Sequence, residues 1–382
     1  MRYEPNAANS APIYLVGAFP PPVQGAAVVN QAMREMLCAR GIEPVILNLS
    51  PTSLRRSWLS RLSRVRNVIR ATFKYFRKKP DVGGDTLYVG LSGSWGQLYE
   101  IFFIMVARMR GDAIFLHHHS FAYLDKKSLL TNALVRLAGQ SATHIVLCGG
   151  QARKLKLRYG EQASTTVLSN AVLVSTGSTS QSRIRTQLRT VGFLGNISFE
   201  KGIAEVIAIA KELESKHSDL KVEVAGPFAD GAAETVLREA VARSRILRYV
   251  GPRYGSEKED FWESIDVLLF PSRYSHECAP LVVYEAMARG IPAIAWDRGC
   301  LSDMLAATPG LLVSQDQDFV SHAVQRLQQW QDNPALLSEA SRATLLEFSE
   351  QRKYYLCTRD ALLAALSKSP ALQGTAEAAI SR

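Results

Sequence analysis

Pro271–Gly299 reads PSRYSHECAPLVVYEAMARGIPAIAWDRG and has the pattern of a loop, a helix and a strand in succession. A buried apolar strand ends just before it at Phe270, and Pro280 suits the first turn of the helix, where a missing N–H costs little. Gly290 and Pro292 then end the helix and begin the next strand. This order of elements predicts a parallel β-α-β unit.

The same alternation continues on both sides of this stretch, because short apolar or β-branched runs are separated by longer helical patterns. Two series of about six strands and helices predict an α/β fold with two doubly wound, Rossmann-like parallel sheets. The expected strands are Ile13–Gly17, Pro44–Leu49, Thr86–Leu91, Ala113–His117, His144–Cys148, Thr166–Ser169, Thr190–Gly195, Lys221–Gly226, Ile246–Val250, Asp266–Phe270, Pro292–Trp296 and Gly310–Val313.

Length and composition suggest where the domains end. At roughly 150 residues a domain, 382 residues favour two. We expect an N-terminal domain over residues 1–173, a linker rich in Ser, Thr and Gly over 174–186, and a C-terminal domain over 187–348. A last helix and an Ala/Ser-rich tail fill residues 349–382. Ligands of open α/β sheets bind outside the carboxyl ends of the strands, so the two domains should share a cleft there.

The positive charge is concentrated in one segment. The chain has 45 Lys and Arg against 35 Asp and Glu, and the segment from Thr52 to Lys79 holds ten basic residues and no acidic one. Its apolar residues recur at helical spacing, which predicts a basic amphipathic helix over residues 55–79. Such helices lie on anionic membranes, where each cation contributes about 1 kcal/mol. The alternatives are a packed domain helix with solvated arginines, or nucleic acid, for which no motif is present.

Three negative observations limit the other classes. The first twelve residues, MRYEPNAANSAP, contain no apolar signal region. The longest apolar run, near Ile101–Ala107, is far shorter than the ~20 residues of a membrane span. The five scattered cysteines include no C-x-x-C, which argues against a thiolate zinc site. We therefore expect a cytoplasmic chain, either soluble or peripheral at a membrane.

The helix that begins at Pro280 has the features of an anion site. Its first backbone N–H groups, near Ala279, Leu281 and Val282, would present a positive helix end to a phosphate. Glu277 precedes this helix and Glu285 lies on it. Carboxylates beside a phosphate site suit sugar hydroxyls better than the phosphate itself. Alternatively, Glu277 is a loop residue favoured by the helix dipole and Glu285 is a solvated helix residue.

Glu277 and Glu285 form Glu-x7-Glu within PSxxxxExxPLVVxEAMAxGIPAIA, which resembles the signature of the retaining glycosyltransferases of the GT-B fold, family four. Other segments resemble the same family's strand ends, its Lys-Gly loop and its interdomain segment. They are VGFLGNISFEKG at Val191–Gly202, VEVAGP at Val222–Pro227, YVGP at Tyr249–Pro252 and VLSNA at Val167–Ala171.

The resemblance implies transfer of a sugar from a nucleotide-diphospho-sugar with retention of configuration, without a metal or other cofactor. It implies that Glu277 lies near the hydroxyls of the transferred sugar and that Glu285 binds the ribose. Lys201 would neutralise the diphosphate, together with the helix start, which is formed by Ala279, Pro280 and Leu281. From spacing alone, Lys201 is an exposed lysine at a helix start.

Asn196 stands where the family usually has Arg, so the chain lacks one cation of the phosphate clamp. Asn can donate a neutral hydrogen bond, and Arg298 or Arg273 are candidates to compensate.

In the N-terminal half, PPPVQGAA at Pro20–Ala27 resembles the family's glycine-rich loop near the donor phosphate, with Gly25 as its one glycine. A structural turn is the alternative, and the absence of GxGxxG disfavours a dehydrogenase.

His117, His118 and His119 end a strand and offer either a metal site or a catalytic histidine. Side chains alternate along a strand, so at most two of the three share a face, and no metal site is expected. The family often has a histidine here that faces the donor sugar; His119 fits best and His118 next, with a core histidine as the alternative.

The Asp316–Asp318 D-x-D opens a helix and is interpreted as capping.

The basic helix and the family together suggest an acceptor linked to polyprenyl diphosphate at the inner face of a bacterial membrane. The product would then be a surface glycan such as exopolysaccharide, capsule or the O-antigen of lipopolysaccharide. Three alternatives stay open: a soluble transferase with a small acceptor, a nucleotide-sugar epimerase or hydrolase, and a non-enzymatic protein that binds polyanions.

Overall fold

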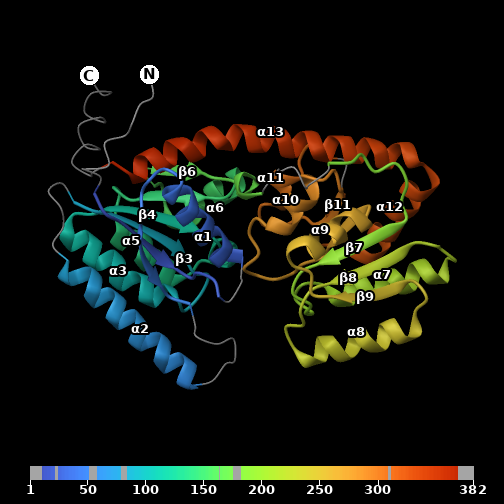
Figure 1. Ribbon diagram of the computed structural model, residues 1–382, viewed down its shortest axis with the longest axis horizontal. Helices are drawn as coiled ribbons and strands as arrows, with labels where there is room; N and C mark the ends of the chain where they lie inside the picture. Colours follow the sequence, from blue (N-terminus) through green and yellow to red (C-terminus); the bar gives the residue numbers. More distant parts are fainter. Residues whose placement is uncertain are drawn as a thin grey trace. The chain divides into compact units, whose positions relative to one another are not determined.

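The computed structural model describes residues 11–21, 25–50, 58–78, 84–162, 164–174, 182–308 and 311–368. The chain divides into two compact units, which are coloured along the sequence in Figure 1. Unit 1 takes the residues up to Ser169 together with those from Tyr355, and unit 2 is Asn170–Tyr354.

Unit 1 is built on a six-stranded parallel sheet of order β2-β1-β3-β4-β5-β6. Its strands are β1 (Ile13–Gly17), β2 (Val45–Asn48), β3 (Thr86–Leu91), β4 (Ala113–His118), β5 (Thr143–Val146) and β6 (Ser164–Val167). Its helices are α1 (Gly25–Cys38), α2 (Trp58–Arg77), α3 (Gln97–Arg110), α4 (Ala122–Asp125), α5 (Leu129–Ala138) and α6 (Gly149–Tyr159).

Unit 2 has a second six-stranded sheet, of order β12-β11-β10-β7-β8-β9. Its strands are β7 (Thr190–Leu194), β8 (Lys221–Ala225), β9 (Leu247–Gly251), β10 (Val267–Phe270), β11 (Ala293–Trp296) and β12 (Leu311–Val313). Its helices are η1 (Asn170–Leu173), α7 (Ile203–Ser215), α8 (Gly231–Arg243), α9 (Gly255–Ser264), α10 (Leu281–Met287), α11 (Leu301–Met304) and α12 (Phe319–Asp332).

The predicted fold class is confirmed, since every expected strand is present with ends shifted by at most one or two residues. Both sheets are parallel throughout. Their strands are nearly continuous apolar runs because helices cover both faces. β10 is fully buried along its length, as the apolar run before Pro271 predicts.

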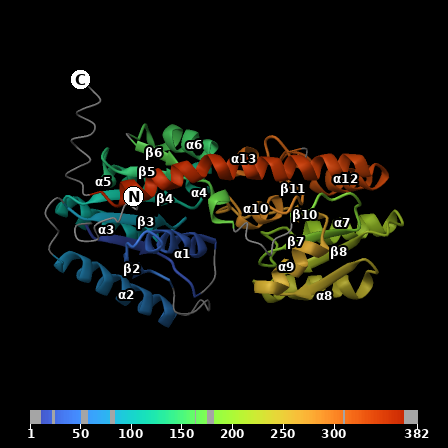
Figure 2. The same cartoon turned by 45° about the horizontal axis from the view of Figure 1, so that its top comes forward.

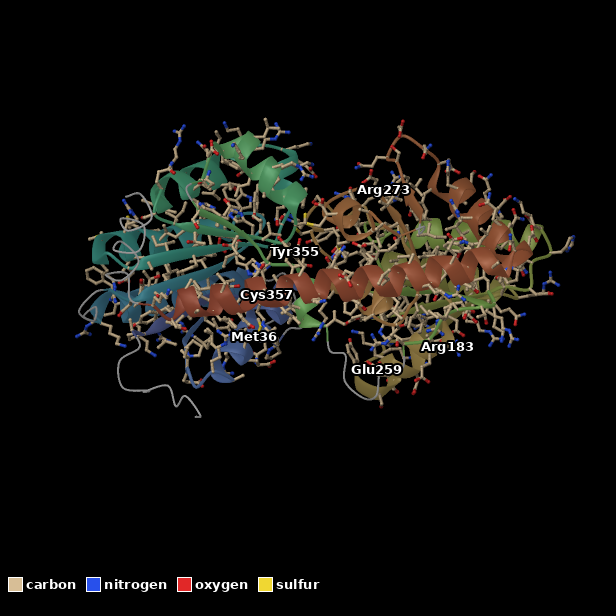
Figure 3. The ribbon with its side chains drawn as sticks, turned by 90° about the horizontal axis from the view of Figure 1, so that it is seen from above. Met36, Arg183, Glu259, Arg273, Tyr355 and Cys357 are labelled. Carbon is tan, nitrogen blue, oxygen red and sulfur yellow. The ribbon has the colours of Figure 1, made fainter. Side chains whose placement is uncertain are left out.

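The last helix is longer than the sequence interpretation gave it. α13 runs Pro334–Leu366, whereas a start near residue 349 was expected. The first turn begins at Pro334, as suits a residue without an N–H, and Leu337, Ala340 and Phe348 continue one buried stripe along the helix. From Tyr355, labelled in Figure 3 with Cys357, the helix belongs to unit 1. Most of the expected linker, residues 175–181, lies outside the described residues.

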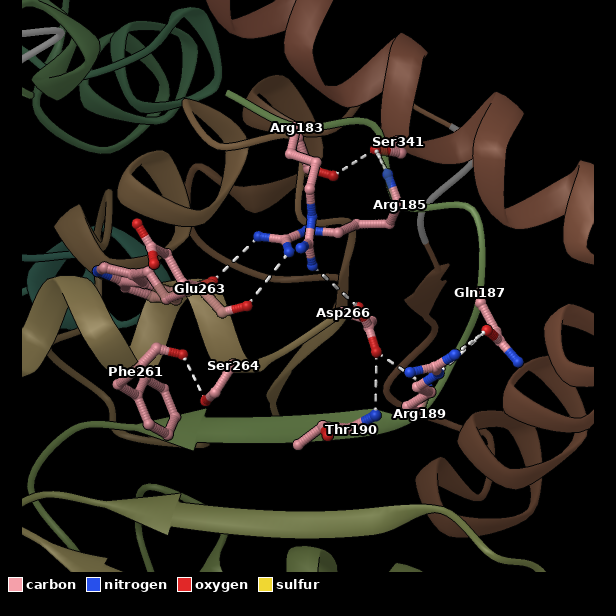
Figure 4. Close-up of polar contacts among 12 residues, drawn as sticks. Arg183, Arg185, Gln187, Arg189, Thr190, Phe261, Glu263, Ser264, Asp266 and Ser341 are labelled. Carbon is pink, nitrogen blue, oxygen red and sulfur yellow. Dashed lines mark hydrogen bonds and ion pairs between the residues drawn. The ribbon is translucent and has the colours of Figure 1, made fainter. Parts of the chain in front are cut away.

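The amino end of the second sheet is closed by a buried polar network (Figure 4). Asp266 accepts hydrogen bonds from the backbone N–H groups of Arg189 at 2.8 Å and Thr190 at 3.0 Å. Arg185, only 2% exposed, donates to the carbonyl of Trp262 at 3.0 Å. Burial lowers the pKa of this guanidinium to about 10, and hydrogen bonds to carbonyls offset the cost of desolvating it. The residues of the second sheet that the sequence marks as candidate site residues follow the opposite, carboxyl ends of its strands.

Candidate active site

The carboxyl end of the second sheet has a point where the strand order reverses. β7 lies beside β10, and from this pair the chain builds outward to β8 and β9 on one side and to β11 and β12 on the other. Loops that leave two such strands diverge to opposite faces and leave a crevice for a ligand. The loop after β7 contains Lys201, and the loop after β10 contains Glu277.

These two loops are held against each other by backbone contacts. Gly202 has a φ of 86°, and a Cβ at this position would lie 2.4 Å from the carbonyl oxygen of Pro271. Only glycine fits there, because another residue would be strained in backbone and would collide with the second loop. The N–H of Arg273 also donates to the carbonyl of Glu200 at 2.8 Å. The position of Lys201 relative to Glu277 is therefore fixed by the backbone.

Lys201 forms an ion pair with Glu277 Oε2. Ser272 Oγ donates to the same oxygen at 3.2 Å, and Lys201 Nζ lies 4.8 Å from the ring centre of Tyr274. The side chains of Lys201 and Glu277 are 24% and 13% exposed, so the pair is sheltered but reachable from solvent. The two residues that the resemblance assigns to the diphosphate and to the sugar are in direct contact.

The backbone that follows Glu277 is pinned on several sides. The N–H of Glu277 donates to Tyr274 at 3.0 Å, and the carbonyl of Cys278 accepts from the N–H of Cys300 at 3.0 Å. The carbonyl of Ala279 accepts from Nδ2 of the buried Asn170 at 2.7 Å. These bonds orient the segment leading into α10 before any ligand binds, which is what an electrostatic site requires.

α10 starts at Leu281 after Pro280, as expected, but ends at Met287 and not near Arg289. Its first N–H groups, including that of Leu281, have no acceptor within the helix. Gly290, with a φ of 68°, ends the helical segment, as the sequence predicts. Arg289 turns back and donates from Nη1 to the carbonyl of Glu285 at 2.8 Å.

Glu285 projects from α10 and is 22% exposed. Its Oε1 lies 2.7 Å from Nζ of Lys258, a residue of α9 that the sequence analysis did not identify. Lys258 stands in an ordinary run of charges, GSEKED, so no local pattern marks it. Just after α10, Arg289 pairs with Glu259 of α9, which Figure 3 labels.

Asn196 is exposed in the loop after β7, and the structure separates the two arginines that were considered as its replacement. Arg273, labelled in Figure 3, lies 3.6 Å from Glu205 and stacks 4.3 Å from the ring of Trp296. Arg298 follows β11, the strand next to β10, and its Nε is buried without a hydrogen-bond partner among the described residues. Arg298 is the better placed of the two cations to meet an anion at this sheet edge.

In unit 1, Gly25 is the first residue of α1 and is exposed, and residues 22–24 of its loop lie outside the described residues. A Cβ at Gly25 would meet nothing within 4 Å. The protein fold therefore does not require glycine there. A close approach by a ligand would supply such a requirement.

The three consecutive histidines at the end of β4 divide between two faces, as the strand alternation predicts. The rings of His117 and His119 lie together with centroids 4.1 Å apart. His118 points the other way, with Nδ1 2.9 Å from Tyr123 Oη and Nε2 2.9 Å from Nδ1 of His144. Both nitrogens of His118 are thus engaged inside the core, which favours the structural interpretation of that residue.

His119 is half-buried, and its Nε2 has no partner among the described residues. Burial lowers the pKa of His119 to about 4, and it lowers that of His144 to about 4 as well. At neutral pH both imidazoles are therefore uncharged. His119 is better suited to a neutral hydrogen bond with a ligand than to an ionic contact.

The D-x-D segment has the structural role expected of it at one of its two acids. Asp318 is the N-cap of α12 and its Oδ2 accepts from the N–H of Ser321 at 2.8 Å. Hydrogen bonds from the side chain and then from the backbone N–H of Ser321 lower the pKa of Asp318. Asp316 accepts instead from Ser314 Oγ. Across the residues that the structure describes, no group of three His, Cys, Asp or Glu is arranged to hold a metal ion.

Two doubly wound sheets, with a Lys-Glu pair at the switch point of the second, have the architecture of the GT-B fold. The solved structures that the chain resembles agree with this fold. Anabaena HepE, solved in complex with UDP, matches with a TM-score of 0.68 at 15% identity and covers 93% of this chain and 99% of its own. WaaG, a glycosyltransferase involved in lipopolysaccharide biosynthesis, matches with a TM-score of 0.62 at 13% identity, over 93% and 99%.

The sequence comparisons agree with the family resemblance. Residues 175–344 match the model of the family described as Glycosyl transferases group 1. The chain is 29% identical over 160 residues to the D-inositol 3-phosphate glycosyltransferase of Corynebacterium urealyticum, 40% of this chain. It is 31% identical over 128 residues to the GDP-mannose-dependent alpha-mannosyltransferase of Mycolicibacterium smegmatis, 33% of this chain. The matched segments span 37% and 30% of those relatives' lengths.

Proposed function

We propose that this chain transfers a sugar from a nucleotide-diphospho-sugar to an acceptor hydroxyl, with retention of configuration and without a metal ion. The observation that carries the proposal is the contact between Lys201 and Glu277 at the reversal point of the second sheet. The pair joins a cation suited to a diphosphate and a carboxylate suited to sugar hydroxyls, at the sheet edge where ligands of this fold bind.

The charge of the leaving group sets the demand on the site. As the sugar departs, the nucleoside diphosphate gains negative charge, and groups already oriented toward it lower the barrier most. Lys201 and Glu277 compensate each other's charge in their ion pair. When the donor binds, the Lys201 ammonium moves to the diphosphate. Glu277 then accepts hydrogen bonds from the sugar hydroxyls instead of pairing with Lys201. Arg298 and the N–H groups at the start of α10 complete the anion site in place of the arginine that Asn196 replaces.

Glu285 binds the ribose hydroxyls, and Lys258 holds its carboxylate in place until they arrive. The resemblance alone assigns Gly25 to the donor phosphate and His119 to the donor sugar, and a neutral imidazole such as that of His119 suits a hydrogen bond to a sugar hydroxyl. We assign no covalent nucleophile: Cys278 is buried beside Glu277, with its Sγ 3.8 Å from that of Cys300, and has no base assigned to it. The acceptor attacks from the face that the nucleotide leaves.

The names of the similar proteins indicate which nucleotides to test in the donor. HepE is described in complex with UDP and with UDP-glucose, and the mycobacterial relative is named for GDP-mannose. Both nucleotides are diphosphates, which agrees with a cationic site opposite a ribose-binding carboxylate. UDP-sugars are the first donors to test, and GDP-sugars the second.

The test is a donor-hydrolysis and transfer assay followed by nuclear magnetic resonance at the anomeric proton, with EDTA present. The proposal expects release of the nucleoside diphosphate, a product with the anomeric configuration of the donor, and no loss of rate with EDTA. An inverted product, or a rate that returns only with magnesium, contradicts the mechanism. Conversion of the donor to an isomer in the absence of acceptor would favour the epimerase alternative.

We also propose that the acceptor is a lipid-linked glycan, such as one on polyprenyl diphosphate, and that the chain acts at the cytoplasmic face of a membrane in bacterial surface polysaccharide synthesis. Support comes from the basic segment around α2 and from the likeness to WaaG in fold. No helix among the described residues is long and apolar enough to cross a bilayer.

The membrane proposal has a charge-reversal test. Arg66, Arg70 and Lys74 are exposed on α2. Changing all three to Glu should abolish binding to anionic vesicles and leave donor hydrolysis intact, because the donor site lies in unit 2. Unchanged vesicle binding would contradict the proposal and favour a soluble transferase with a small acceptor.

A further inference from the structure

α2 turns an unexpected side of itself toward the core. Val68 and Tyr75 are buried at 3% and 0% exposure and pack among the core residues of unit 1. The rings of Tyr75 and Phe103 of α3 lie 6.4 Å apart. The described part of the apolar stripe predicted from the sequence, Ile69, Phe73 and Phe76, faces solvent with 63%, 56% and 54% exposure. These three side chains therefore do not serve the packing of unit 1.

α3, the neighbour of α2, has an outward face that is also apolar. Leu98, Phe102, Met105 and Met109 are spaced by four, three and four residues and are 42%, 50%, 41% and 71% exposed. This spacing puts them in one stripe along the helix. A surface helix normally carries polar residues on that side, so a stripe of this kind indicates a covering partner. Trp95, just before the helix, is 78% exposed.

The charge around these side chains has one sign. Arg66, Arg70, Lys74, Arg77 and Lys78 are exposed on or just after α2, and Arg108 is exposed on α3. Residues 66–78 contain no Asp or Glu. The acid of α3, Glu100, is 2% exposed and accepts from the N–H of Ser92 at 2.8 Å.

The two helices form one face and are fixed in place. α2 and α3 lie side by side in Figures 1 and 2, with α5 beyond α3. Arg110, at the end of α3, donates to the carbonyl of Tyr75 at 2.8 Å and from Nε to Asp112 at 2.8 Å. The guanidinium thereby satisfies a carbonyl at the end of α2 and ties the two helices together.

We propose that the exposed apolar side chains of α2 and α3, together with Trp95, are inserted into the outer part of an anionic lipid bilayer. This inference deepens the proposed function, since it names the residues by which the enzyme would reach a lipid-linked acceptor. Large apolar side chains flanked by arginine and lysine fit acyl chains beneath anionic headgroups, into which such a face sinks by about 5–10 Å. A second copy of the chain would bring two sets of cations together and is disfavoured by repulsion.

Trp95 reports insertion directly. The tryptophans of unit 2, Trp262, Trp296 and Trp330, are at most 1% exposed, so a Trp58→Phe chain leaves Trp95 as the solvent-exposed reporter. Vesicles of equal parts phosphatidylglycerol and phosphatidylcholine, the latter brominated on its acyl chains, should quench Trp95 emission. Vesicles of phosphatidylcholine alone should quench it far less. A Trp58→Phe, Trp95→Phe chain is the control for quenching of the buried rings.

A second variant separates the contribution of the apolar side chains to membrane binding from that of the charged ones. Phe102→Gln with Met105→Gln should lower the partition coefficient on the anionic vesicles at least about tenfold, because two large side chains no longer leave water. Both positions are exposed, so folding should be unaffected, as a melting curve checks. Leu157→Gln, on α6 and 78% exposed, is the matched control and should bind like the parent.

Two results would overturn the inference. Vesicle binding without quenching of Trp95, equal in the parent and in the double variant, would mean a purely electrostatic contact. A dimer in solution that the double variant dissociates would assign the face to a second copy. Nucleotide binding is measured on the same samples: insertion without any response to nucleoside diphosphates would leave the membrane face standing and remove the proposed function.

Discussion

The carboxyl ends of the two sheets carry different kinds of polar side chain: neutral histidines in unit 1 and an ion pair in unit 2. At the end of β4 in unit 1, His118 bonds to Tyr123 and His144, and burial keeps the histidines of this cluster neutral. At the reversal point of the sheet in unit 2, Lys201 and Glu277 form an ion pair that solvent still reaches. The first end holds uncharged, hydrogen-bonded rings, and the second holds paired charges.

The difference shows how burial decides what a polar residue can do. Burial keeps the histidines at the first end uncharged, so they serve the fold. Nε2 has no partner among the described residues in His117, His119 and His144, and of these three only His119 is half-buried and not fully buried. The pair at the second end keeps both charges because each compensates the other, and a charged ligand can exchange for either partner. Donor chemistry is therefore expected in unit 2.

The largest expected effect is a loss of stability in acid that originates in unit 1. Burial lowers the pKa of His144 from its ordinary 6.5 to about 4, so the unfolded chain binds a proton there before the folded one does. Stability from this residue should be complete above pH ~6.5 and should fall by about 3 kcal/mol on going down to pH ~4. Burial shifts His117 and His118 in the same direction.

Urea unfolding at a series of pH values in this range measures how the free energy of unfolding changes with pH. In a His144→Gln variant that folds, the slope of the free energy of unfolding against pH should decrease by the amount that one bound proton contributes. His322→Gln, at a half-buried position on α12 of unit 2, is the control variant. A slope that His144→Gln does not alter would assign the acid sensitivity elsewhere.

Next in size is the effect of Lys201→Met on transfer. Loss of one preorganised group that meets developing charge lowers the rate by about 10²–10³-fold. The free energy of unfolding should change by no more than about 1 kcal/mol, because the ion pair is partly solvated. Steady-state rates and melting curves of Lys201→Met are compared with those of Lys211→Met, an exposed lysine on α7. Equal rates for the two variants would remove Lys201 from the mechanism.

Glu285→Gln should weaken the binding of a nucleoside diphosphate about tenfold, since a carboxylate accepts stronger hydrogen bonds from hydroxyls than an amide does. Lys258→Met should cost about threefold, because Glu285 then lacks the partner that orients it. Calorimetric titrations of the single and double variants give the coupling. Strictly additive losses would show that Lys258 does not act through Glu285.

The smallest predicted effect separates the two arginines. Arg298→Gln should weaken diphosphate binding by about threefold to tenfold, the value of one cation at a partly solvated site. Arg273→Gln should leave affinity unchanged, because Arg273 is engaged with Glu205 and Trp296. The reverse pattern would assign the compensation for Asn196 to Arg273.

The fold and part of the site were predictable from sequence because their signals are local. Apolar runs, Pro280 and Gly290 mark where strands and helices begin and end, and the order of those elements determines a parallel α/β sheet. The Glu-x7-Glu segment is equally local, because both carboxylates belong to one loop and helix.

The unpredicted features depend on residues distant in sequence. Lys258 meets Glu285 from another helix, 27 positions away in sequence, and His144 meets His118 from another strand, 26 positions away. The exposure of Phe73 and Phe76 was equally invisible, because helical spacing defines a stripe but does not say which side of the helix meets the core. The early start of α13 was missed since its first buried residues also fit the end of a domain.

Thermal unfolding with UDP, GDP, ADP and CMP, each in EDTA and in magnesium, tests the central claim most directly. A ligand at a hundred times its Kd stabilises by about 2.7 kcal/mol, which a melting curve detects. The account predicts a shift with one nucleoside diphosphate that persists in EDTA and disappears in Glu285→Ala. No shift with any nucleotide, or an undiminished shift in Glu285→Ala, would contradict a donor site at the junction of β7 and β10.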